Sequence, residues 1–463
     1  MDPHALFVRM LVGPLWAAWE HSPYLRHYRR LRQAQYDSPE AIRDRQRSAV
    51  LLIVAYARRA TSFYKKRLEA AGVAHDRTLL WNDFARIPVL TKADIRSHGP
   101  EMRVEGIDRS KLVRKTTSGS TGVSLEVWVD EASMQFKRAC TLRSDEWSGW
   151  RFGESTAMIW GNPEFVKHGW RGRLRNTLLE RKRYLDTLKM DQATMLRFAD
   201  DLARRPPSLI FGHAHSVFLF AEFVRRQELR PIRPKGIITS AMILHDWQRR
   251  KIEEVFACEV TNRYGCEEVS LIACECERHE GLHVNCDGVY VELLRDGQPV
   301  GPGEPGSVIV TDLSNRAMPM IRYQVGDVAT CSARTCSCGR GFPLLERVEG
   351  READYVTTTR GELISGISLT ENFALQVPGI AQLQIIQEER DRFVFRIVRG
   401  KDFGQASLER ISGLVAERFG TDARFNCEYL DNIAAEPSGK YRFCISRVPN
   451  VFTSGVPAEA LSR

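Results

Sequence analysis

Thr116-Thr117-Ser118-Gly119-Ser120-Thr121-Gly122 is the stretch that says most about the fold, and it directly follows Arg114 and Lys115. Its two glycines let the backbone approach a phosphate closely, and its five hydroxyl side chains add donors beside the backbone N–H groups. It lacks the Gly-Lys-Ser/Thr ending of a P-loop and the three-glycine spacing of a dinucleotide-binding turn. The stretch therefore predicts either a polyphosphate-binding loop of another kind or a flexible linker.

Length and composition indicate a globular protein of several domains. The chain has 463 residues, of which 43% are apolar and 27% charged, so we expect two or three domains. Because no apolar run approaches the roughly 20 residues that span a bilayer, we expect no transmembrane segment. Eleven cysteines, an odd and clustered set, argue against a disulfide framework and favour a reducing, cytoplasmic location.

The net charge of +9 includes two local concentrations of basic residues, Arg26 to Arg32 and Arg171 to Arg183. Neither has the interleaved aromatic residues of a single-strand binder, which argues against a nucleic-acid function. A basic surface facing an acidic small molecule or acidic cell components explains the charge as well. The apolar stretch Leu6 to Trp19 is broken by Arg9 and precedes no small-residue cleavage site. We therefore expect an amphipathic helix on the protein body or on a membrane surface, not a secretory signal.

Patterning along the chain predicts an α/β fold. Helical periodicity covers roughly Pro39 to Ala71, mixed strand and helix follow from about Lys111 to Gly265, and His283 to Ala329 is rich in strands. After Gly350-Arg351 the pattern restarts as strand, helix, strand, strand, helix and strand, ending near Arg447. We therefore predict a large domain over residues 1–350 (mainly helical over 1–75), a small α+β domain over 351–450 and a tail over 451–463.

Two segments carry side chains suited to the glycine- and serine-rich stretch. Asn262-Arg263-Tyr264-Gly265-Cys266-Glu267-Glu268 ends a probable strand, where an aromatic ring can stack on adenine and a carboxylate four residues later can hold Mg²⁺. In Arg322-Tyr323-Gln324-Val325-Gly326-Asp327, a carboxylate placed after a glycine turn can accept both hydroxyls of a ribose. Tyr264 could instead be a packed aromatic, and Asp327 could simply form the turn.

Two further segments follow in order. Gly350-Arg351-Glu352-Ala353-Asp354 lies at the proposed domain boundary, and Pro437-Ser438-Gly439-Lys440-Tyr441-Arg442-Phe443 presents one lysine on a turn. Arg351 could instead form a structural ion pair, and Lys440 could be a solvated turn residue. Together the five segments resemble the adenylate-forming superfamily, and within it the phenylacetate–coenzyme A ligase family and its branch found in capsule and exopolysaccharide clusters. Ile87 to Arg96 and Ala317 to Tyr323 support this branch, and the resemblance covers about residues 45 to 447.

The resemblance implies a large N-terminal domain, a small mobile C-terminal domain and an active site between them that uses ATP, Mg²⁺ and coenzyme A. It also implies a homodimer. Residue by residue, it implies that the β- and γ-phosphates are bound by Ser118, Gly119, Ser120, Thr121 and Gly122, and that the adenine pocket is lined by Ser240, Ala241, Met242, Tyr264 and Gly265. It further implies that Glu268 holds Mg²⁺, that Asp327 holds the ribose and that Arg351 lies near the nucleotide. Lys440 would reach the carboxylate and the α-phosphate.

The leading hypothesis is an AMP-forming acid:coenzyme A ligase that activates a small carboxylic acid with ATP. Glu267, Ala241 and Ala353 depart from the residues that many relatives carry at these positions. An adenylating enzyme that delivers its acyl group to an amine or a hydroxyl is therefore a second hypothesis. A non-catalytic nucleotide-binding or scaffold protein is a third.

The acid pocket has two candidate residues. Gly212-His213-Ala214-His215-Ser216 follows a predicted strand ending at Phe211, in a region that borders the carboxylate pocket of the family. His213 and His215 are therefore candidates to contact the acid, although a helix start packed on the core explains them equally well. Trp160 could form another wall of the pocket or be a core aromatic.

Cysteine and histidine gather in two short segments, Cys274, Cys276, His279 and His283 within ten residues, and Cys331, Cys336 and Cys338 about fifty residues further on. Cys336-Ser337-Cys338-Gly339 is a knuckle that can direct two thiolates at one ion, and a Cys/His pair upstream would complete a tetrahedral zinc site. We predict a structural zinc held by Cys276, His283, Cys336 and Cys338, with His279 or Cys274 as substitutes. Buried free thiols are the alternative.

Overall fold

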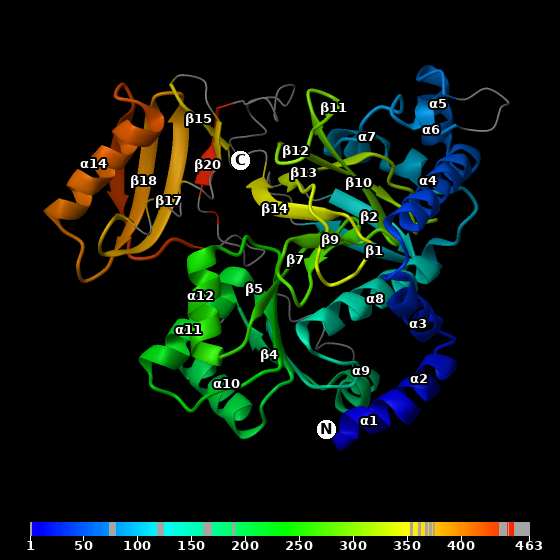
Figure 1. Cartoon of the computed structure of the whole chain (residues 1–463), viewed down its shortest axis with the longest axis horizontal. Coiled ribbons are helices and arrows are strands. Elements are labelled where there is room, and N and C mark those ends of the chain that lie inside the picture. The colour runs from blue at the N-terminus through cyan, green and yellow to red at the C-terminus, as the bar shows by residue number, and fades with distance from the viewer. Residues whose placement is uncertain are drawn as a thin grey trace.

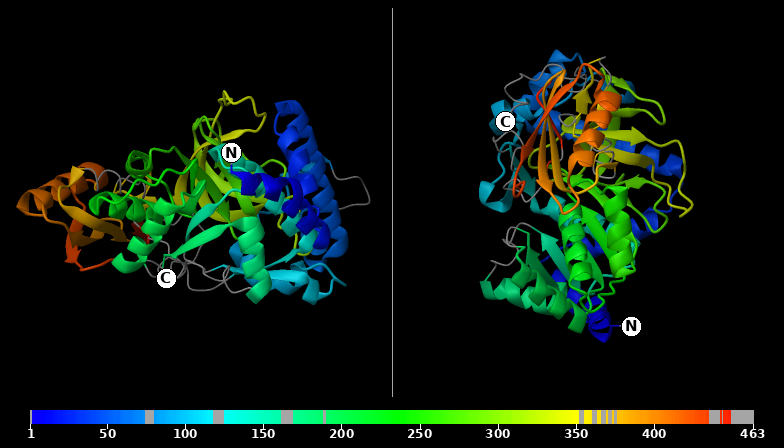
Figure 2. Two further views of the ribbon diagram at one scale, coloured as in Figure 1. Left: turned by 90° about the horizontal axis from the view of Figure 1, so that it is seen from below. Right: turned by 90° about the vertical axis from the view of Figure 1, so that its left-hand side faces the viewer.

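The computed structural model describes residues 2–73, 80–117, 125–160, 169–187, 190–351, 355–359, 363–365, 369, 373, 376–434, 442 and 444–448. A large body with a long mixed sheet carries the N-terminal helices at one side, and a small unit lies at the opposite end of the long axis (Figures 1 and 2). The predicted α/β class is confirmed.

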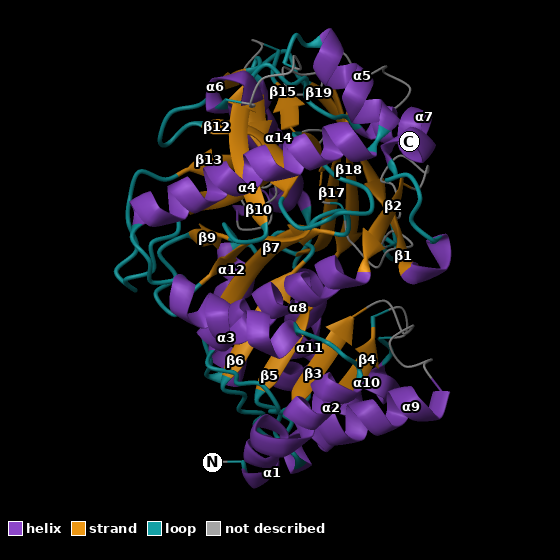
Figure 3. Cartoon of the chain, turned by 90° about the vertical axis from the view of Figure 1, so that its right-hand side faces the viewer, coloured by secondary structure: helices purple, strands orange, loops and turns teal. Residues whose placement is uncertain are grey.

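The N-terminal quarter is helical, as predicted, and its elements are α1 (Pro3–Phe7), the π-helical turn η1 (Val8–Val12), α2 (Gly13–Trp19), α3 (Tyr24–Ala34), α4 (Pro39–Ala60), α5 (Ser62–Ala70), α6 (Trp81–Phe84) and α7 (Lys92–Met102). Helix α4 begins where the Ser38 side chain accepts a hydrogen bond from the Ala41 N–H and Pro39 fills the first turn. Its buried stripe then recurs every three or four residues, at Ile42, Gln46, Val50, Ile53, Val54 and Ala57. This stripe lies over the antiparallel part of the sheet (Figure 3), where Gln46 Nε2 donates to the Val289 carbonyl at 2.9 Å.

One half of the long sheet is parallel and contains β3 (Thr156–Trp160), β4 (Lys182–Asp186), β5 (Leu209–His213), β6 (Gly236–Ser240) and β7 (Val260–Cys266). The helical elements of this region are α8 (Glu131–Asp145), the 3₁₀ turn η3 (Glu146–Ser148), α9 (Gly169–Arg175), the π-helical turn η5 (Asn176–Glu180), α10 (Gln192–Arg204), α11 (Ala214–Arg226) and α12 (Asp246–Phe256). Parallel strands need such crossovers, which bury both sheet faces and explain the continuous apolar runs at Leu209 and Gly236.

The other half is antiparallel and contains β8 (Ser270–Glu275), β9 (Leu282–Val284), β10 (Val289–Arg295), β11 (Gln298–Pro299), β12 (Pro305–Asp312), β13 (Tyr323–Cys331) and β14 (Leu344–Arg351). The strand order across the sheet is β11-β10-β12-β13-β14-β9-β8-β7-β6-β5-β3-β4. A separate antiparallel pair, β1 (Leu112–Thr117) and β2 (Leu125–Asp130), follows the 3₁₀ turn η2 (Arg109–Lys111). Its register pairs Thr117 with Leu125, so the two strands bracket residues 118–124.

The C-terminal unit has its own core and sheet. Its elements are β15 (Tyr355–Thr357), β16 (Leu363–Ser365), β17 (Ile380–Glu389), β18 (Arg392–Arg399), α14 (Gln405–Phe419), β19 (Arg424–Tyr429) and β20 (Cys444–Ser446). Helix α14 has an apolar stripe in which Ile411, Leu414, Val415 and Phe419 are buried and Leu408 is half-buried. The expected element order was incomplete, because a short hairpin opens the unit and two strands, not one, follow α14. The division into domains at residue 350 stays a prediction.

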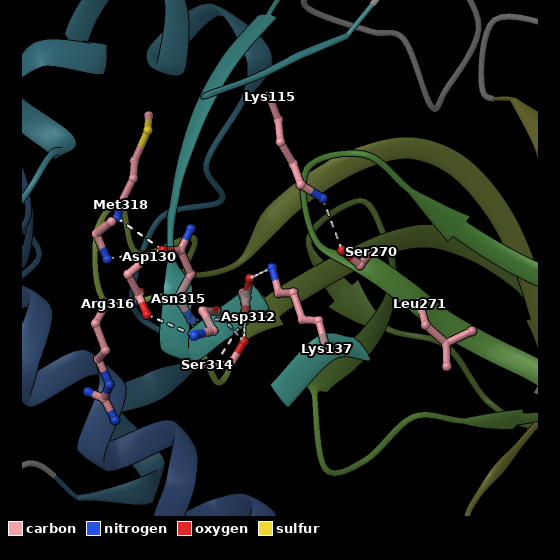
Figure 4. Close-up of polar contacts among 12 residues, drawn as sticks. Lys115, Asp130, Lys137, Ser270, Leu271, Asp312, Ser314, Asn315, Arg316 and Met318 are labelled. Atoms are coloured by element: carbon pink, nitrogen blue, oxygen red, sulfur yellow. Dashed lines mark hydrogen bonds and ion pairs between the residues drawn. The ribbon is translucent and has the colours of Figure 1, made fainter. Parts of the chain in front are cut away.

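A buried ion pair fastens α8 to the end of β12. Lys137 Nζ lies 2.6 Å from Asp312 Oδ2, and both side chains are buried (Figure 4). The second carboxylate oxygen of Asp312 accepts hydrogen bonds from the Ser314 hydroxyl and from the backbone N–H groups of Ser314 and Asn315. Every charge in this cluster is therefore compensated, and removal of one partner leaves the other charge buried.

We expect Lys137→Met to lower the free energy of unfolding by about 3–5 kcal/mol, because an unpaired Asp312 carboxylate stays in the core. Chemical denaturation measures this change. Lys66→Met is the matched control: Lys66 pairs with Glu101 on the surface at 3.3 Å, and its loss should cost about 0–1 kcal/mol. Equal effects of the two substitutions would contradict the prediction, and the double variant Lys137→Met/Asp312→Asn should recover part of the loss.

Candidate active site

Strand β7 lies at the boundary between the parallel half and the antiparallel half of the long sheet. It pairs in parallel with β6 and antiparallel with β8. In open α/β sheets, ligands bind beyond the carboxyl ends of the parallel strands. The carboxyl ends of β3, β5, β6 and β7 carry Trp160, His213, Ser240 and the segment Tyr264 to Cys266. The fold therefore brings the predicted adenine and acid residues to one edge of the sheet.

The backbone at this edge has one unusual conformation. Ala241, directly after β6, has φ +63°, in the left-handed region that a residue with a Cβ rarely adopts. Ser240 before it is buried. A non-glycine residue held in this conformation beside a strand end is typical of sites where the surrounding structure imposes local geometry.

The side chains of Tyr264 and Asp327, from strands β7 and β13, are in contact. The Tyr264 hydroxyl donates a hydrogen bond to Asp327 Oδ2 at 2.8 Å, and the Tyr264 ring is buried. Tyr264 lies in the carboxyl-terminal part of β7, near the strand end where it was expected, whereas Asp327, expected after a glycine turn, lies within β13. Gly326 has φ +90°, but it belongs to an irregularity in the β12–β13 ladder and not to a turn between strands. Such a bulge directs a side chain out of the regular pleat.

The adjacent carboxylates Glu267 and Glu268 have opposite environments. Glu268 is 6% exposed, and its Oε1 accepts a hydrogen bond from the Tyr323 hydroxyl at 2.9 Å. Burial and the neighbouring Glu268 carboxylate raise the pKa of Tyr323 well above its usual range, so this hydroxyl keeps its proton. The Glu267 side chain is 64% exposed, and its Oε2 lies 3.7 Å from Lys115 Nζ. Only Glu268 is therefore held in a fixed position by a buried donor.

Lys115 is a residue whose place in the site the sequence did not reveal. Its Nζ donates to the Ser270 hydroxyl (Figure 4) and to the Glu267 carbonyl, both at 3.4 Å, and burial lowers its pKa. Lys115 lies in β1, three residues before Ser118, so this contact joins the start of the glycine- and serine-rich stretch to the β7–β8 turn. The turn itself is tight, because a Cβ on Gly265 would lie 2.4 Å from the Ser270 carbonyl oxygen. The only sequence signal was that Lys115 is a basic residue next to the stretch.

Arg351 lies beside Asp327, whereas several other predicted site residues fall outside the described part of the chain. Arg351 ends β14, where its backbone is in register with Asp327, so the two positions are cross-strand neighbours. The predicted phosphate-binding residues Ser118, Gly119, Ser120, Thr121 and Gly122 lie outside the described residues, as do Lys440 and Ala353.

The two histidines proposed for the acid pocket lie in different environments. His213 is buried at the end of β5, and its ring centroid lies 4.0 Å from that of Trp160. His215 lies one residue into α11, where its Nδ1 is 3.2 Å from Gln248 Nε2 of α12. Burial and the nearby His245 lower the pKa of His215 to about 4. His213 and Trp160 therefore share the edge of the sheet, whereas His215 contacts the helix layer.

The four predicted zinc ligands come together. The ligand atoms of Cys276, His283, Cys336 and Cys338 all lie within 4.8 Å of one another. The Sγ atoms of Cys276 and Cys336 are 3.6 Å apart, and Cys338 Sγ is 3.4 Å from His283 Nε2. Backbone N–H groups of Arg278 and Arg340 donate to Cys276 Sγ and Cys338 Sγ at 3.4 Å. These separations are near the edges of a zinc tetrahedron, about 3.5–3.8 Å from the usual bond lengths.

The chemistry of this donor set also fits a metal. Burial and the Arg340 guanidinium lower the pKa of His283 to about 4, so its imidazole is neutral near pH 7, which is the form that binds metals. The two substitutes are placed elsewhere. His279 Nδ1 lies 3.2 Å from Glu275 Oε2, and the buried Cys274 thiol interacts with Arg263.

Two segments that supported the family resemblance lie against each other. The Leu90 N–H donates to the Arg322 carbonyl at 2.8 Å, and the Gln324 N–H donates to the Leu90 carbonyl at 2.9 Å. The buried Arg322 guanidinium also binds both oxygens of Glu292, each at 3.0 Å, and the Ile87 carbonyl. The segment from Ile87 therefore positions the strand that carries Tyr323 and Asp327.

Comparison with known proteins finds one family model and several relatives that match this chain. A family model described as the CapK C-terminal domain matches residues 356–447. The chain is 22% identical to Protein CapK of Staphylococcus aureus over 402 residues, which are 85% of this chain and 86% of that protein. It is 26% identical to the phenylacetate-coenzyme A ligase of Thermus thermophilus over 332 residues, 68% of this chain and 72% of the ligase.

The fold is that of a solved acyl-coenzyme A ligase. A crystal structure of 2-hydroxyisobutyryl-CoA ligase in the postadenylation state, in complex with 2-HIB-AMP, superposes with a TM-score of 0.70 at 20% identity. The match covers 90% of this chain and 92% of the ligase. An open conformation of the same ligase, in complex with 2-HIB-AMP and CoA, has a TM-score of 0.60.

We expect Tyr323→Phe to lower the free energy of unfolding by about 1–3 kcal/mol, because it removes the buried donor to the Glu268 carboxylate. Thermal or chemical denaturation tests this. Tyr290→Phe is the matched control: its ring packs on Trp81 and Phe84 at centroid distances of 5.5 and 5.7 Å, and these contacts survive the change. A variant at position 323 as stable as the control would show that the Tyr323–Glu268 hydrogen bond contributes nothing.

Proposed function

We propose that this protein is an ATP-dependent enzyme that activates a carboxylic acid. The chain is a homologue of CapK and of the phenylacetate–coenzyme A ligases, and it has the fold of the adenylate-forming enzymes. The acid becomes an acyl-adenylate, and the acyl group then passes to coenzyme A. The observation that carries this proposal is a pair of hydrogen bonds, Tyr264 to Asp327 and Tyr323 to Glu268, in a region that Lys115 of β1 joins to Ser270.

The roles of the side chains follow from charge and geometry. The Tyr264 ring supplies an aromatic face for adenine, and the Asp327 carboxylate, now bonded to the Tyr264 hydroxyl, is an acceptor for ribose hydroxyls. Ser118 to Gly122 would bind the β- and γ-phosphates. Lys115, which precedes this stretch in the chain and contacts Ser270, would add a cation. Ser240, Ala241 and Gly265 would line the adenine pocket, with Arg351 near the nucleotide.

The first half-reaction joins the acid to the α-phosphate. A carboxylate oxygen attacks the α-phosphorus, the bond to the β-phosphate oxygen breaks, and pyrophosphate leaves. Negative charge grows on the phosphorus oxygens, and Lys440 would stabilise it. Glu268, held by Tyr323, offers the oxygen ligand that Mg²⁺ prefers, and a bound Mg²⁺ would neutralise phosphate charge. His213, stacked on Trp160, would border the acid, and His215 would act only through the helix layer.

The second half-reaction transfers the acyl group. The thiol sulfur of coenzyme A attacks the acyl carbon, AMP leaves with the bonding electron pair, and the thiol proton passes to solvent. A small domain over residues 351–450 would rotate against residues 1–350, with 451–463 as a tail, so that Lys440 leaves and the acceptor enters. A reducing cytoplasmic location fits eleven cysteines that are all free thiols. A homodimer is the oligomeric state that we propose.

A second candidate is an adenylating enzyme that delivers its acyl group to an amine or hydroxyl. Glu267 supports it, because it departs from the family pattern and its carboxylate lies 3.7 Å from Lys115 Nζ beside the site. Incubation of the acyl-adenylate with coenzyme A or with candidate amines, followed by mass analysis of the conjugate, separates the two. A non-catalytic nucleotide-binding protein would form neither product.

We expect Lys440→Ala to reduce acid-dependent exchange of labelled pyrophosphate into ATP by about 100-fold or more, because a cation is lost where charge develops. The assay starts with phenylacetate and 2-hydroxyisobutyrate and extends to a library of carboxylic acids. Lys401→Ala, which removes an exposed lysine between β18 and α14, is the control and should keep the wild-type rate. Exchange that survives in Lys440→Ala would remove the catalytic role of this residue, and no exchange with any acid would refute the activity.

We also propose that Cys276, His283, Cys336 and Cys338 hold one structural Zn²⁺. Four protein ligands complete a tetrahedron, so the ion would join the β8–β9 segment to the segment between β13 and β14 without taking part in the reaction.

Protein purified without chelators should contain about one zinc per chain by elemental analysis, and less than about half an equivalent would refute the site. Cys336→Ser should lose most of the metal and unfold at a lower temperature. Cys331→Ser is the matched control, because this cysteine lies in the same segment but outside the cluster. Removal of zinc by a strong chelator should lower the melting temperature of the wild type and of Cys331→Ser alike.

A further inference from the structure

The N-terminal helices point their large apolar side chains away from the body. Six such residues lie on α1, η1 and α2, and their exposed fractions run from 45% at Leu6 to 74% at Met10: Leu6, Phe7, Met10, Leu11, Leu15 and Trp19. No helix among the described residues is long and apolar enough to cross a membrane. The exposed set is nevertheless larger than scattered surface residues require, which marks an interaction surface.

The fully buried positions of the same segment are small residues, and Val12 and Trp16 are half-buried beside them. Ala5, Val8, Gly13 and Ala17 are buried. A Cβ on Gly13 would lie 2.7 Å from the Phe152 ring, so the contact has no room for a larger residue. Arg9 Nε donates to the Phe152 carbonyl at 2.7 Å. The orientation of the helices is therefore fixed by packing, and the large side chains cannot turn inward without displacing the small ones.

A neighbouring helix adds to this surface. Helix α9 lies beside α2 (Figures 1 and 3) and exposes Leu174 and Trp170, the latter at 70%. Arg175 of α9 binds Glu20 at the end of α2 at 2.7 Å. We refer to residues 2–34 together with 169–183 as the N-terminal face.

The N-terminal face carries nearly all of the protein's net charge. Its two segments contain eleven arginines and lysines against three aspartates and glutamates, a net +8, whereas the whole chain has +9. The three carboxylates are already paired: Asp2 with Arg181, Glu20 with Arg175, and Glu180 with Lys182 at 3.1 Å. Within the described residues, the exposed Arg26, Arg29, Arg30 and Arg173 have no carboxylate partner, so their charge is available to a ligand.

We propose that the N-terminal face docks on the surface of a bilayer that contains anionic phospholipid. Leu, Met, Phe and Trp side chains enter the boundary between headgroups and acyl chains, while the arginines bind lipid phosphates. A second copy of this chain is a less suitable partner for the N-terminal face, because a symmetric contact would place two surfaces of net charge +8 against each other. This inference does not depend on the proposed activity.

Flotation of the full-length protein with vesicles tests the proposal. The protein should float with vesicles of phosphatidylcholine and about 30% phosphatidylglycerol, but not with phosphatidylcholine alone. About 0.5 M salt should weaken the binding. Met10→Ser/Leu15→Ser/Trp19→Ser should bind at least about tenfold more weakly, because it removes three side chains from the lipid boundary.

Two matched controls use exposed residues elsewhere on the chain. Leu52→Ser/Leu219→Ser/Leu430→Ser removes exposed apolar side chains from other elements and should float like the wild type. Arg26→Gln/Arg29→Gln/Arg30→Gln should lose binding, whereas Arg109→Gln/Arg334→Gln/Arg390→Gln, which lowers the net charge equally, should keep most of it. Circular dichroism and the melting temperature establish that each variant is folded.

Several results would overturn the proposal. Absence of flotation with the anionic vesicles would do so, as would an equal loss of binding in the control triples. Light scattering that finds a dimer in the wild type and a monomer in Met10→Ser/Leu15→Ser/Trp19→Ser, without vesicle binding, would assign the face to self-association. Acid-dependent pyrophosphate exchange by the folded variants in solution is measured separately, so a failure of docking is distinguishable from a failure of the proposed activity.

Discussion

Strand β7 is hydrogen-bonded in parallel to β6 and antiparallel to β8, and the arrangement of the whole site depends on this double pairing. The parallel side brings strand ends, with Ser240 and His213, to one edge. The antiparallel side returns the chain through a turn so tight that only glycine fits at position 265 against the Ser270 carbonyl. Because one strand joins both halves, Tyr264 on β7 can reach Asp327 on β13, although 63 residues separate them in sequence.

Buried charges hold the surrounding elements in position. Arg322 binds Glu292 and the backbone of the segment from Ala85 to Ile87, and Lys137 binds Asp312. Arg143 is fully buried, binds Asp287 at 2.6 Å and lies over the rings of Trp147 and Phe342, which also flank His283. Each pair joins elements distant in sequence. In a low-dielectric interior such pairs specify one arrangement, because a displaced partner would leave a charge without compensation.

The net positive charge of the protein lies on a different part of the molecule from the candidate active site. Among the described residues, the candidate site contains carboxylates, a tyrosine pair and the cation of Lys115, and these polar groups are largely paired with one another. The excess positive charge lies instead on the N-terminal face, on helices attached through small residues and a backbone carbonyl. This placement lets a charged surface form without perturbing the ionisable groups of the site, since the interaction of separated surface charges is screened by salt over about 10 Å.

Local patterns determined much of this protein. The helical periodicity of α4, the strand β5 that contains Phe211, and the Cys276/His283 and Cys336/Cys338 spacing were readable because each depends on residues close together in the chain. Only the tertiary structure decided that Asp327 lies within a strand and contacts Tyr264, that Glu267 faces Lys115 while Glu268 faces Tyr323, and that Leu6 to Trp19 points its large side chains outward. These outcomes depend on long-range pairing and on which face of an element is covered. Periodicity shows that an element has two faces, but packing against distant residues decides which face is buried.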